Sequence, residues 1–151
     1  VARWPGRIKA GSRTGQTVCL TDLMATCAAI TGAKLPPTAA EDSFNILPVI
    51  LGQDDKPIRE YTLHQTISLA LAIRNGDWKY LDHKGSGGNR YGGSMQKYAI
   101  ADSAPDVPGQ LYNLSSDPGE RNNLVSDKPA IARALKAKLE EFKSSGRSAP
   151  R

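Results

Sequence analysis

The sequence has few of the residues that most often carry catalysis or redox chemistry. Its 151 residues include two histidines, His64 and His83, and two cysteines, Cys19 and Cys27. No G-x-S-x-G motif occurs, which excludes the serine chemistry of the α/β-hydrolases. No apolar run approaches the roughly 20 residues that a membrane-spanning helix requires. We therefore expect no membrane partner.

Two cysteines are too few for a disulfide framework or a thiolate metal site. If both lay on one helix, Cys19 and Cys27 would be separated by about 12 Å, which is too far for a disulfide. We expect one thiol in a loop or at the surface and the other in the core. The chain starts at Val1 rather than Met and has no secretory signal pattern, which suggests processing or truncation and leaves the compartment unassigned.

The net charge of +5 does not by itself predict a nucleic-acid partner. The Lys and Arg residues are scattered, without the dense basic blocks or interleaved aromatics of nucleic-acid binders, so we expect none. The acidic pairs Glu41-Asp42 and Asp54-Asp55 lack the spacing of a calcium loop and have no neighbouring histidine. We expect no metal ligands in this chain.

The stretch Leu69–Leu81 predicts a β-hairpin, because two apolar runs flank Asn75-Gly76. Asn and Gly both accept the positive φ that a type I′ turn requires at its two central positions. This turn would place Ile73 opposite Trp78, and Trp78 would then be a core aromatic rather than a sugar platform. One apolar face is expected to contain Leu71, Ile73, Trp78 and Tyr80.

Further elements follow from periodicity and from the positions of glycine and proline. They are a strand ending at Pro5, helices over Val18–Thr31, within Asn45–Leu51 and over Pro129–Lys143, and strands over Glu60–Ile67 and Gln110–Leu114. A glycine-rich stretch at His83–Gly93 is expected to be a connector. The fold class is α+β, with a small antiparallel sheet of about four strands packed by the C-terminal helix and preceded by a helix-containing segment.

The two long helices each carry an apolar stripe at steps of three and four residues. In the C-terminal helix the stripe is expected to cover one face of the sheet. The predicted buried residues are Leu20, Leu23, Met24, Cys27, Ile30 and Thr31 in the first helix, and Ile131, Leu135, Leu139 and Phe142 in the last.

His64 is the best candidate for a functional side chain. It lies on the less apolar face of its strand, beside Thr62 and Thr66, and the alternative is a hydrogen-bonded surface histidine. His83 borders the glycine-rich connector, where little would hold it in place. From the residues alone, no catalytic set emerges.

Six segments, in this order, resemble the late part of a type I sulfatase of the arylsulfatase-A-like bacterial family, within the alkaline-phosphatase superfamily. Together they cover essentially the whole chain. They are RWPGRIKAG at 3–11, TDLMAT at 21–26, AEDSFNILPVILG at 40–52, AIRNGDWKYL at 72–81, QLYNLSSDPGERNNL at 110–124 and GRSAP at 146–150.

The resemblance implies two domains. Residues 1–57 would be the end of the catalytic α/β domain, with its last strand and helix, and residues 58–151 the C-terminal subdomain. The first helix would then expose its apolar stripe, and residues 1–52 in isolation would be poorly stable.

The family's chemistry would come from outside this chain. Sulfatases make a formylglycine nucleophile from C-x-P-x-R or S-x-P-x-R, which neither Cys19 nor Cys27 matches, and their Ca²⁺ ligands lie upstream. The resemblance therefore implies no catalytic or metal residues and no cofactor here, and an isolated chain that is inactive.

The resemblance also implies partners and one site residue. His64 matches a histidine common in this subfamily and is expected to bind substrate, either a sulfate-ester small molecule or a sulfated glycan. The family would place the protein in the periplasm or outside the cell. Two alternatives remain, a stand-alone basic module that binds sulfated glycans and a piece of a related phosphodiesterase or phosphonate hydrolase.

Overall fold

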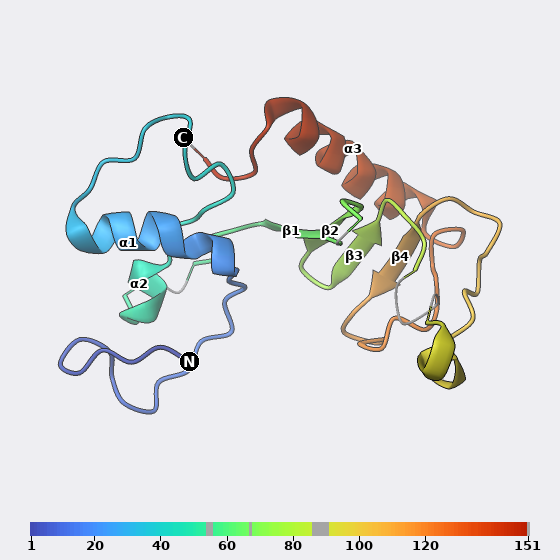
Figure 1. Ribbon diagram of the computed structural model, residues 1–151, viewed down its shortest axis with the longest axis horizontal. Helices are drawn as coiled ribbons and strands as arrows, with labels where there is room; N and C mark the ends of the chain where they lie inside the picture. The colour runs from blue at the N-terminus through green and yellow to red at the C-terminus, as the bar shows by residue number, and fades with distance from the viewer. Residues whose placement is uncertain (54–55, 67, 86–90, 151) are drawn as a thin grey trace. The chain divides into compact units, whose positions relative to one another are not determined.

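The computed structural model describes residues 1–53, 56–66, 68–85 and 91–150, which form two compact units (Figure 1). One unit is Val1–Glu60 together with the tail from Ser145, and the other is Tyr61–Ser144. Asp54-Asp55, Ile67 and the middle of the predicted connector at His83–Gly93 lie outside the described residues.

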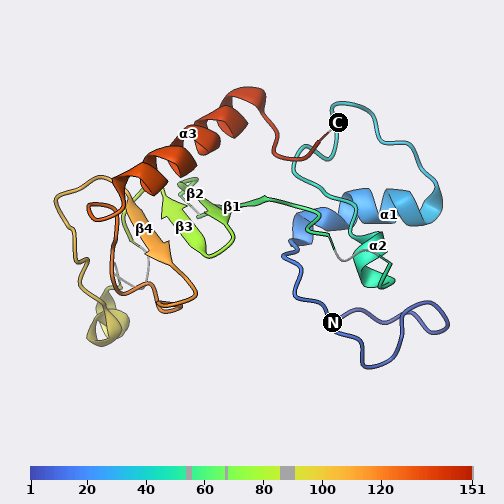
Figure 2. The ribbon, with the colours of Figure 1, turned by 180° about the vertical axis from the view of Figure 1, so that it is seen from behind.

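The second unit contains a four-stranded antiparallel sheet, as the sequence predicts. Its strands are adjacent in chain order, so each neighbouring pair is joined by a local connection. The helix α3, Pro129–Ser145, lies across one face of this sheet (Figure 2). The predicted α+β class is confirmed. The strands are β1 (Tyr61–Gln65), β2 (Leu71–Asn75), β3 (Trp78–Leu81) and β4 (Gln110–Asn113).

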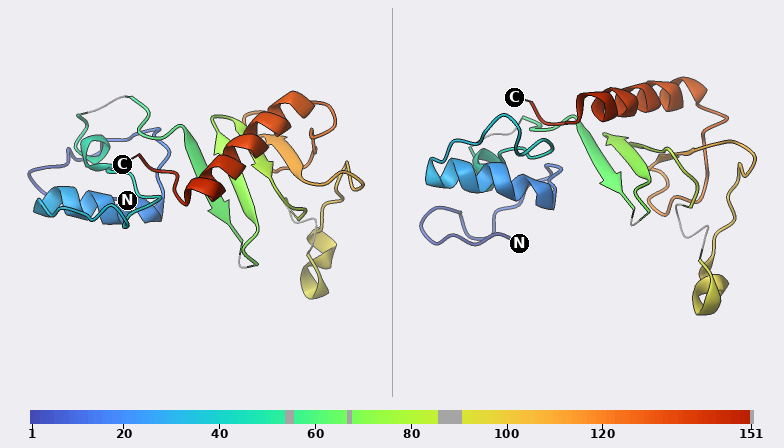
Figure 3. Two further views of the ribbon diagram at one scale, coloured as in Figure 1. Left: turned by 90° about the horizontal axis from the view of Figure 1, so that it is seen from above. Right: turned by 45° about the horizontal axis from the view of Figure 1, so that its top comes forward.

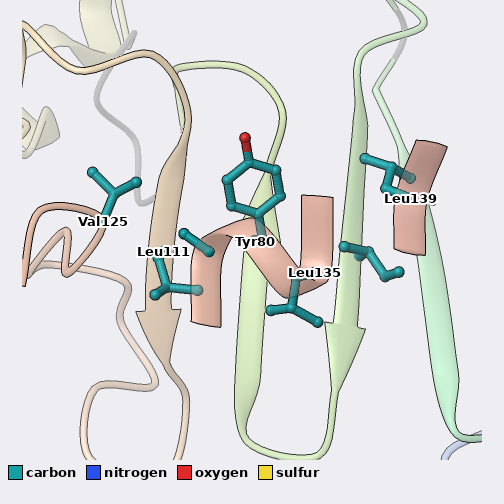
Figure 4. Packing of buried hydrophobic residues seen from close by; sticks show 7 residues of the cluster. Tyr80, Leu111, Val125, Leu135 and Leu139 are labelled. Atoms are coloured by element: carbon teal, nitrogen blue, oxygen red, sulfur yellow. The ribbon is translucent and has the colours of Figure 1, made fainter. Parts of the chain in front are cut away.

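The main core lies between this sheet and α3 (Figure 4). The central cross-strand row consists of Leu63, Ile73, Tyr80 and Leu111, one residue from each strand. Leu135 and Leu139 of α3 pack onto this row and are buried, which confirms the predicted stripe of the last helix. Burying each such leucine stabilises the fold by about 1.5–3 kcal/mol.

The register of the hairpin differs from the prediction by two residues. Ile73 pairs with Tyr80 and Asn75 with Trp78, so the loop is Gly76-Asp77 rather than Asn75-Gly76. Gly76 has φ +54°, and a type II′ turn places glycine at this first central position. Because side chains alternate with period two, the shift leaves the predicted apolar face intact.

The first unit contains a 3₁₀ turn η1 (Leu20–Asp22), the helix α1 (Leu23–Thr31) and a short helix α2 (Leu47–Ile50). Gly32, with φ +73°, ends α1, and Gly52, with φ +68°, follows α2, as predicted. A strand ending at Pro5 does not form. Instead Ile8 N donates to the carbonyl of Trp4 at 2.9 Å, because no strand in the described part of this unit offers a ladder partner.

The burial that periodicity predicts for the α1 stripe is wrong, and the exposed stripe that the resemblance implies is confirmed. Leu20 is 86% and Met24 50% exposed, and Cys27 is exposed rather than a core thiol. The face turned inward is polar instead. Asp22 is 0% and Thr26 2% exposed, because backbone amides of the following segment donate to both side chains.

Candidate functional site

The face of the sheet opposite α3 carries the predicted site residue. Figure 3 shows α3 crossing over the strands, and the register assigns the remaining side chains to the other face. That face places His64 together with the two cationic residues of the central strands. Its cross-strand rows are Thr62, Arg74, Lys79 and Tyr112, and then His64, Ala72, Leu81 and Gln110.

His64 is the fourth residue of β1 and pairs with Ala72 of β2. The residue is exposed, whereas its neighbour Ala72 is only 3% exposed. Thr62 shares this face, as predicted, but is itself buried. Thr66 lies beyond β1, where its hydroxyl is 2.9 Å from that of Ser68.

The two cations of this face are held in different ways. Lys79 Nζ lies 2.6 Å from Glu120 Oε1, and both side chains are largely buried, so this pair is internally neutralised. Arg74 Nε donates to the carbonyl of Gly76 at 2.8 Å. No carboxylate in the described ranges forms an ion pair with Arg74, so its charge remains available to an anion near His64.

A polar network lies at Gln110, the β4 residue in the same cross-strand row as His64. Gln110 Nε2 donates to Asp102 Oδ2 at 2.8 Å, and Asn123 Nδ2 donates to Asp102 Oδ1 at 3.1 Å. Burial acts to raise the pKa of Asp102, but hydrogen bonds from Ala104 N, Asn123 and Gln110 outweigh it, so the pKa is lowered. Asp102 therefore anchors its loop as a carboxylate. The sequence carried no signal for this network, because residues 95–109 have no periodicity.

The two buried tyrosines are unsuited to proton transfer near neutral pH. Burial, with help from Asp82, raises the pKa of Tyr80 to about 12. Burial likewise raises the pKa of Tyr112 above its ordinary value. Both phenols remain protonated at neutral pH, so neither provides a phenolate base.

A buried ionic cluster in the first unit is centred on Asp22. Its carboxylate accepts from Cys19 N at 2.7 Å and Phe44 N at 3.0 Å, and it pairs with Arg59. The Arg59 guanidinium also lies 4.4 Å from the centroid of the Phe44 ring. Burial raises the pKa of the Cys19 thiol, so this cysteine is a poor nucleophile. The cluster links segments of the unit rather than forming a reactive site.

The described residues contain neither a metal-binding cluster nor a membrane-spanning helix. No group of three or more His, Cys, Asp or Glu side chains is placed to hold a metal ion. In the same residues, no helix combines the length and apolar character needed to cross a membrane. His83, the other histidine, is half-buried, with Nδ1 3.0 Å from the carbonyl of Lys84.

Comparisons with known sequences give a consistent family, although no family model matches the chain. It is 33% identical over 144 residues to N-acetylgalactosamine-6-O-sulfatase of Bacteroides thetaiotaomicron, covering 95% of this chain and 27% of that protein. It is 30% identical to human arylsulfatase A, covering 90% and 28%. It is 31% identical to an ulvan-active sulfatase of Formosa agariphila, covering 84% and 28%. The chain therefore spans about a quarter of the length of these relatives.

Solved structures give the same result. A protein from a study of glycosaminoglycan metabolism by Bacteroides thetaiotaomicron superimposes with TM-score 0.62 at 34% identity, covering 82% of this chain and 24% of that one. A putative sulfatase of Bacteroides fragilis, at 17% identity, shares the fold with TM-score 0.65, covering 95% and 29%. This chain is a relative of the type I sulfatases and matches their C-terminal portion.

Proposed function

We propose that this chain forms the C-terminal part of a sulfuric ester hydrolase that acts on aryl or carbohydrate sulfate esters. The observation that carries the proposal is the relationship to named sulfatases across 95% of the chain. Residues 1–57 would complete the catalytic domain, and residues 58–151 would form the C-terminal subdomain. Because all three relatives described above are sulfatases, sulfate esters are favoured over the phosphate esters of a phosphodiesterase.

The cysteines of this chain do not match the nucleophile motif of the family. Neither Cys19 nor Cys27 lies in the motif that becomes formylglycine, and the described residues contain no cluster of ligands for Ca²⁺. The proposed enzyme would therefore take its nucleophile and its metal from sequence outside these 151 residues, and we assign no reaction step to this chain.

His64 is proposed to contact the substrate. Its support is the exposed imidazole on one face of the sheet, with the Arg74 charge on the same face for a sulfate group. In the complete enzyme, His64→Ala should raise KM about three- to tenfold, the value of one hydrogen bond, with a smaller change in kcat. His83→Ala is the matched control and should leave both parameters unchanged. Equal effects of the two substitutions would contradict the assignment.

Two measurements test the family proposal. Sequencing the coding DNA upstream of Val1 should reveal an in-frame C-x-P-x-R or S-x-P-x-R motif. The isolated chain should release no sulfate from an aryl sulfate, with or without Ca²⁺. Turnover above the blank, lost on mutation of a residue of this chain, would contradict it.

A second candidate is a stand-alone module that binds sulfated glycans. It is supported by the net charge of +5 and by the Arg74 guanidinium, which has no carboxylate partner among the described residues. A heparin column distinguishes the two candidates. Elution only above the physiological salt concentration, with earlier elution of Arg74→Gln, would favour the module. Elution below the physiological salt concentration would exclude it.

A further inference from the structure

A slot of about 400 Å³ lies between the start of α3 and one end of the sheet. The sheet contributes one cross-strand row, Tyr61 of β1, Asn75 of β2 and Trp78 of β3. The helix contributes Ala130, Ile131, Ala134 and Leu135. Ile131 and Leu135 also pack against the core, whereas the two alanines, one turn apart, carry only methyl groups and leave space beside the row.

The lining combines aromatic and aliphatic surface with one amide. Trp78 is half-buried, whereas Tyr80 two residues later is only 3% exposed, so Trp78 keeps surface that the core does not cover. Asn75 lies between the two aromatic residues in the row and carries both donor and acceptor atoms. A pyranose ring has the complementary chemistry, with an apolar C–H face for aromatic rings and hydroxyls for an amide.

A lysine whose ion-pair partner is exposed to solvent lies beside the slot, which allows a sulfate group there. No carboxylate of the described residues lines it. Lys138 Nζ lies 5.5 Å from the centroid of the Tyr61 ring, which forms one wall, and 2.7 Å from Glu141 Oε1 on the exposed side of α3. A sulfate on the sugar would share this ammonium group with Glu141.

We propose that the slot is a sugar-binding subsite, which takes one pyranose ring against Trp78 and Tyr61 with a sulfate group toward Lys138. The proposal revises the expectation that Trp78 serves only the core. It depends on the proposed function only for the choice of a sulfated sugar, since an unsulfated sugar tests the slot in either case.

Tryptophan fluorescence can measure the binding directly. The chain has two tryptophans, and Trp4 lies in the other unit, so Trp4→Phe leaves Trp78 as the single reporter. The probes are N-acetylgalactosamine 6-sulfate and unsulfated N-acetylgalactosamine. We expect a saturable change with a Kd on the order of 1 mM, as for one small ring. The sulfated sugar should bind about two- to fivefold tighter, and Lys138→Gln should remove this difference.

A slot-filling substitution provides the decisive variant. Ala134→Leu should abolish the change in Trp78 fluorescence on addition of sugar. It should leave the unfolding temperature unchanged or raised, because it fills the space without removing core contacts. Ala137→Leu, at another exposed position of the same helix that does not line the slot, is the matched control, and its fluorescence should respond to the sugars as that of the parent does. Unchanged titration by Ala134→Leu, or no response of Trp78 to either sugar, would overturn the subsite. Neither result would affect the sulfatase assignment, which the upstream sequence tests separately.

Discussion

Truncating Leu139 should be among the most damaging single changes in the second unit. Its side chain is 0% exposed and packs in the cluster that holds Ile73, Tyr80 and Leu111. Leu139→Ala removes buried methyl groups and leaves a cavity that a sheet with fixed register can only partly close. We expect a loss of about 3–4 kcal/mol in the free energy of unfolding.

The matched control is the same substitution at Leu69, which belongs to the same unit and is 72% exposed. Leu69→Ala should cost less than about 0.5 kcal/mol, as surface changes do. Urea unfolding followed by Trp78 emission in the Trp4→Phe background measures both values, because Trp78 packs against the same core. Similar costs at the two leucines, or a cost below about 1 kcal/mol at Leu139, would refute the packing described above.

Three further changes test other features. Leu69 has φ +64°, so Leu69→Gly should stabilise the second unit by about 1 kcal/mol in urea unfolding, whereas a loss would contradict backbone strain. Ser148 Oγ donates to Asp42 Oδ1 at 2.6 Å, and Ser148→Ala should weaken the attachment of the tail while the backbone bonds of Ser148 N and Ala149 N to Glu41 O remain, which carboxypeptidase digestion would show as about three- to tenfold faster trimming. The raised pKa of Tyr80, about 12, predicts that stability is complete below pH 10 and falls as pH rises toward 12. Tyr80→Phe should flatten that decline, and an unchanged pH profile would exclude Tyr80 as its cause.

The second unit was the more predictable part of the chain. The strands, α3 and the side-chain faces follow from alternation and from the three- and four-residue steps of Leu135 and Leu139, because their apolar partners lie within the same unit. The turn register was missed because Asn75-Gly76 and Gly76-Asp77 both satisfy a hairpin, and packing of Ile73 on Tyr80 decides between them. Periodicity cannot make this distinction, because a two-residue shift preserves every face.

The candidate site was only partly accessible from the sequence. Alternation correctly placed His64 on the face away from the apolar core, although its role stays a prediction. Alternation also assigns Arg74 to that face, but nothing in the sequence showed whether its charge is paired, or that Lys79 pairs with the distant Glu120. Such long-range ion pairs depend on loop paths that carry no local signal. The aromatic row beside α3 was missed for a different reason, since it required the correct hairpin register.

The two units are stabilised by different kinds of interaction, and this difference explains where prediction failed. The second has an apolar core, whereas η1 and α1 turn Asp22 and Thr26 inward and leave Leu20 and Met24 exposed. Helices of water-soluble domains normally have the opposite arrangement, and an exposed apolar stripe usually marks a face that contacts more protein. The proposal that residues 1–57 complete a catalytic α/β domain supplies a reason, because a helix there would pack on the large sheet of that domain. Apolar periodicity in α1 would then describe contacts made in the complete enzyme.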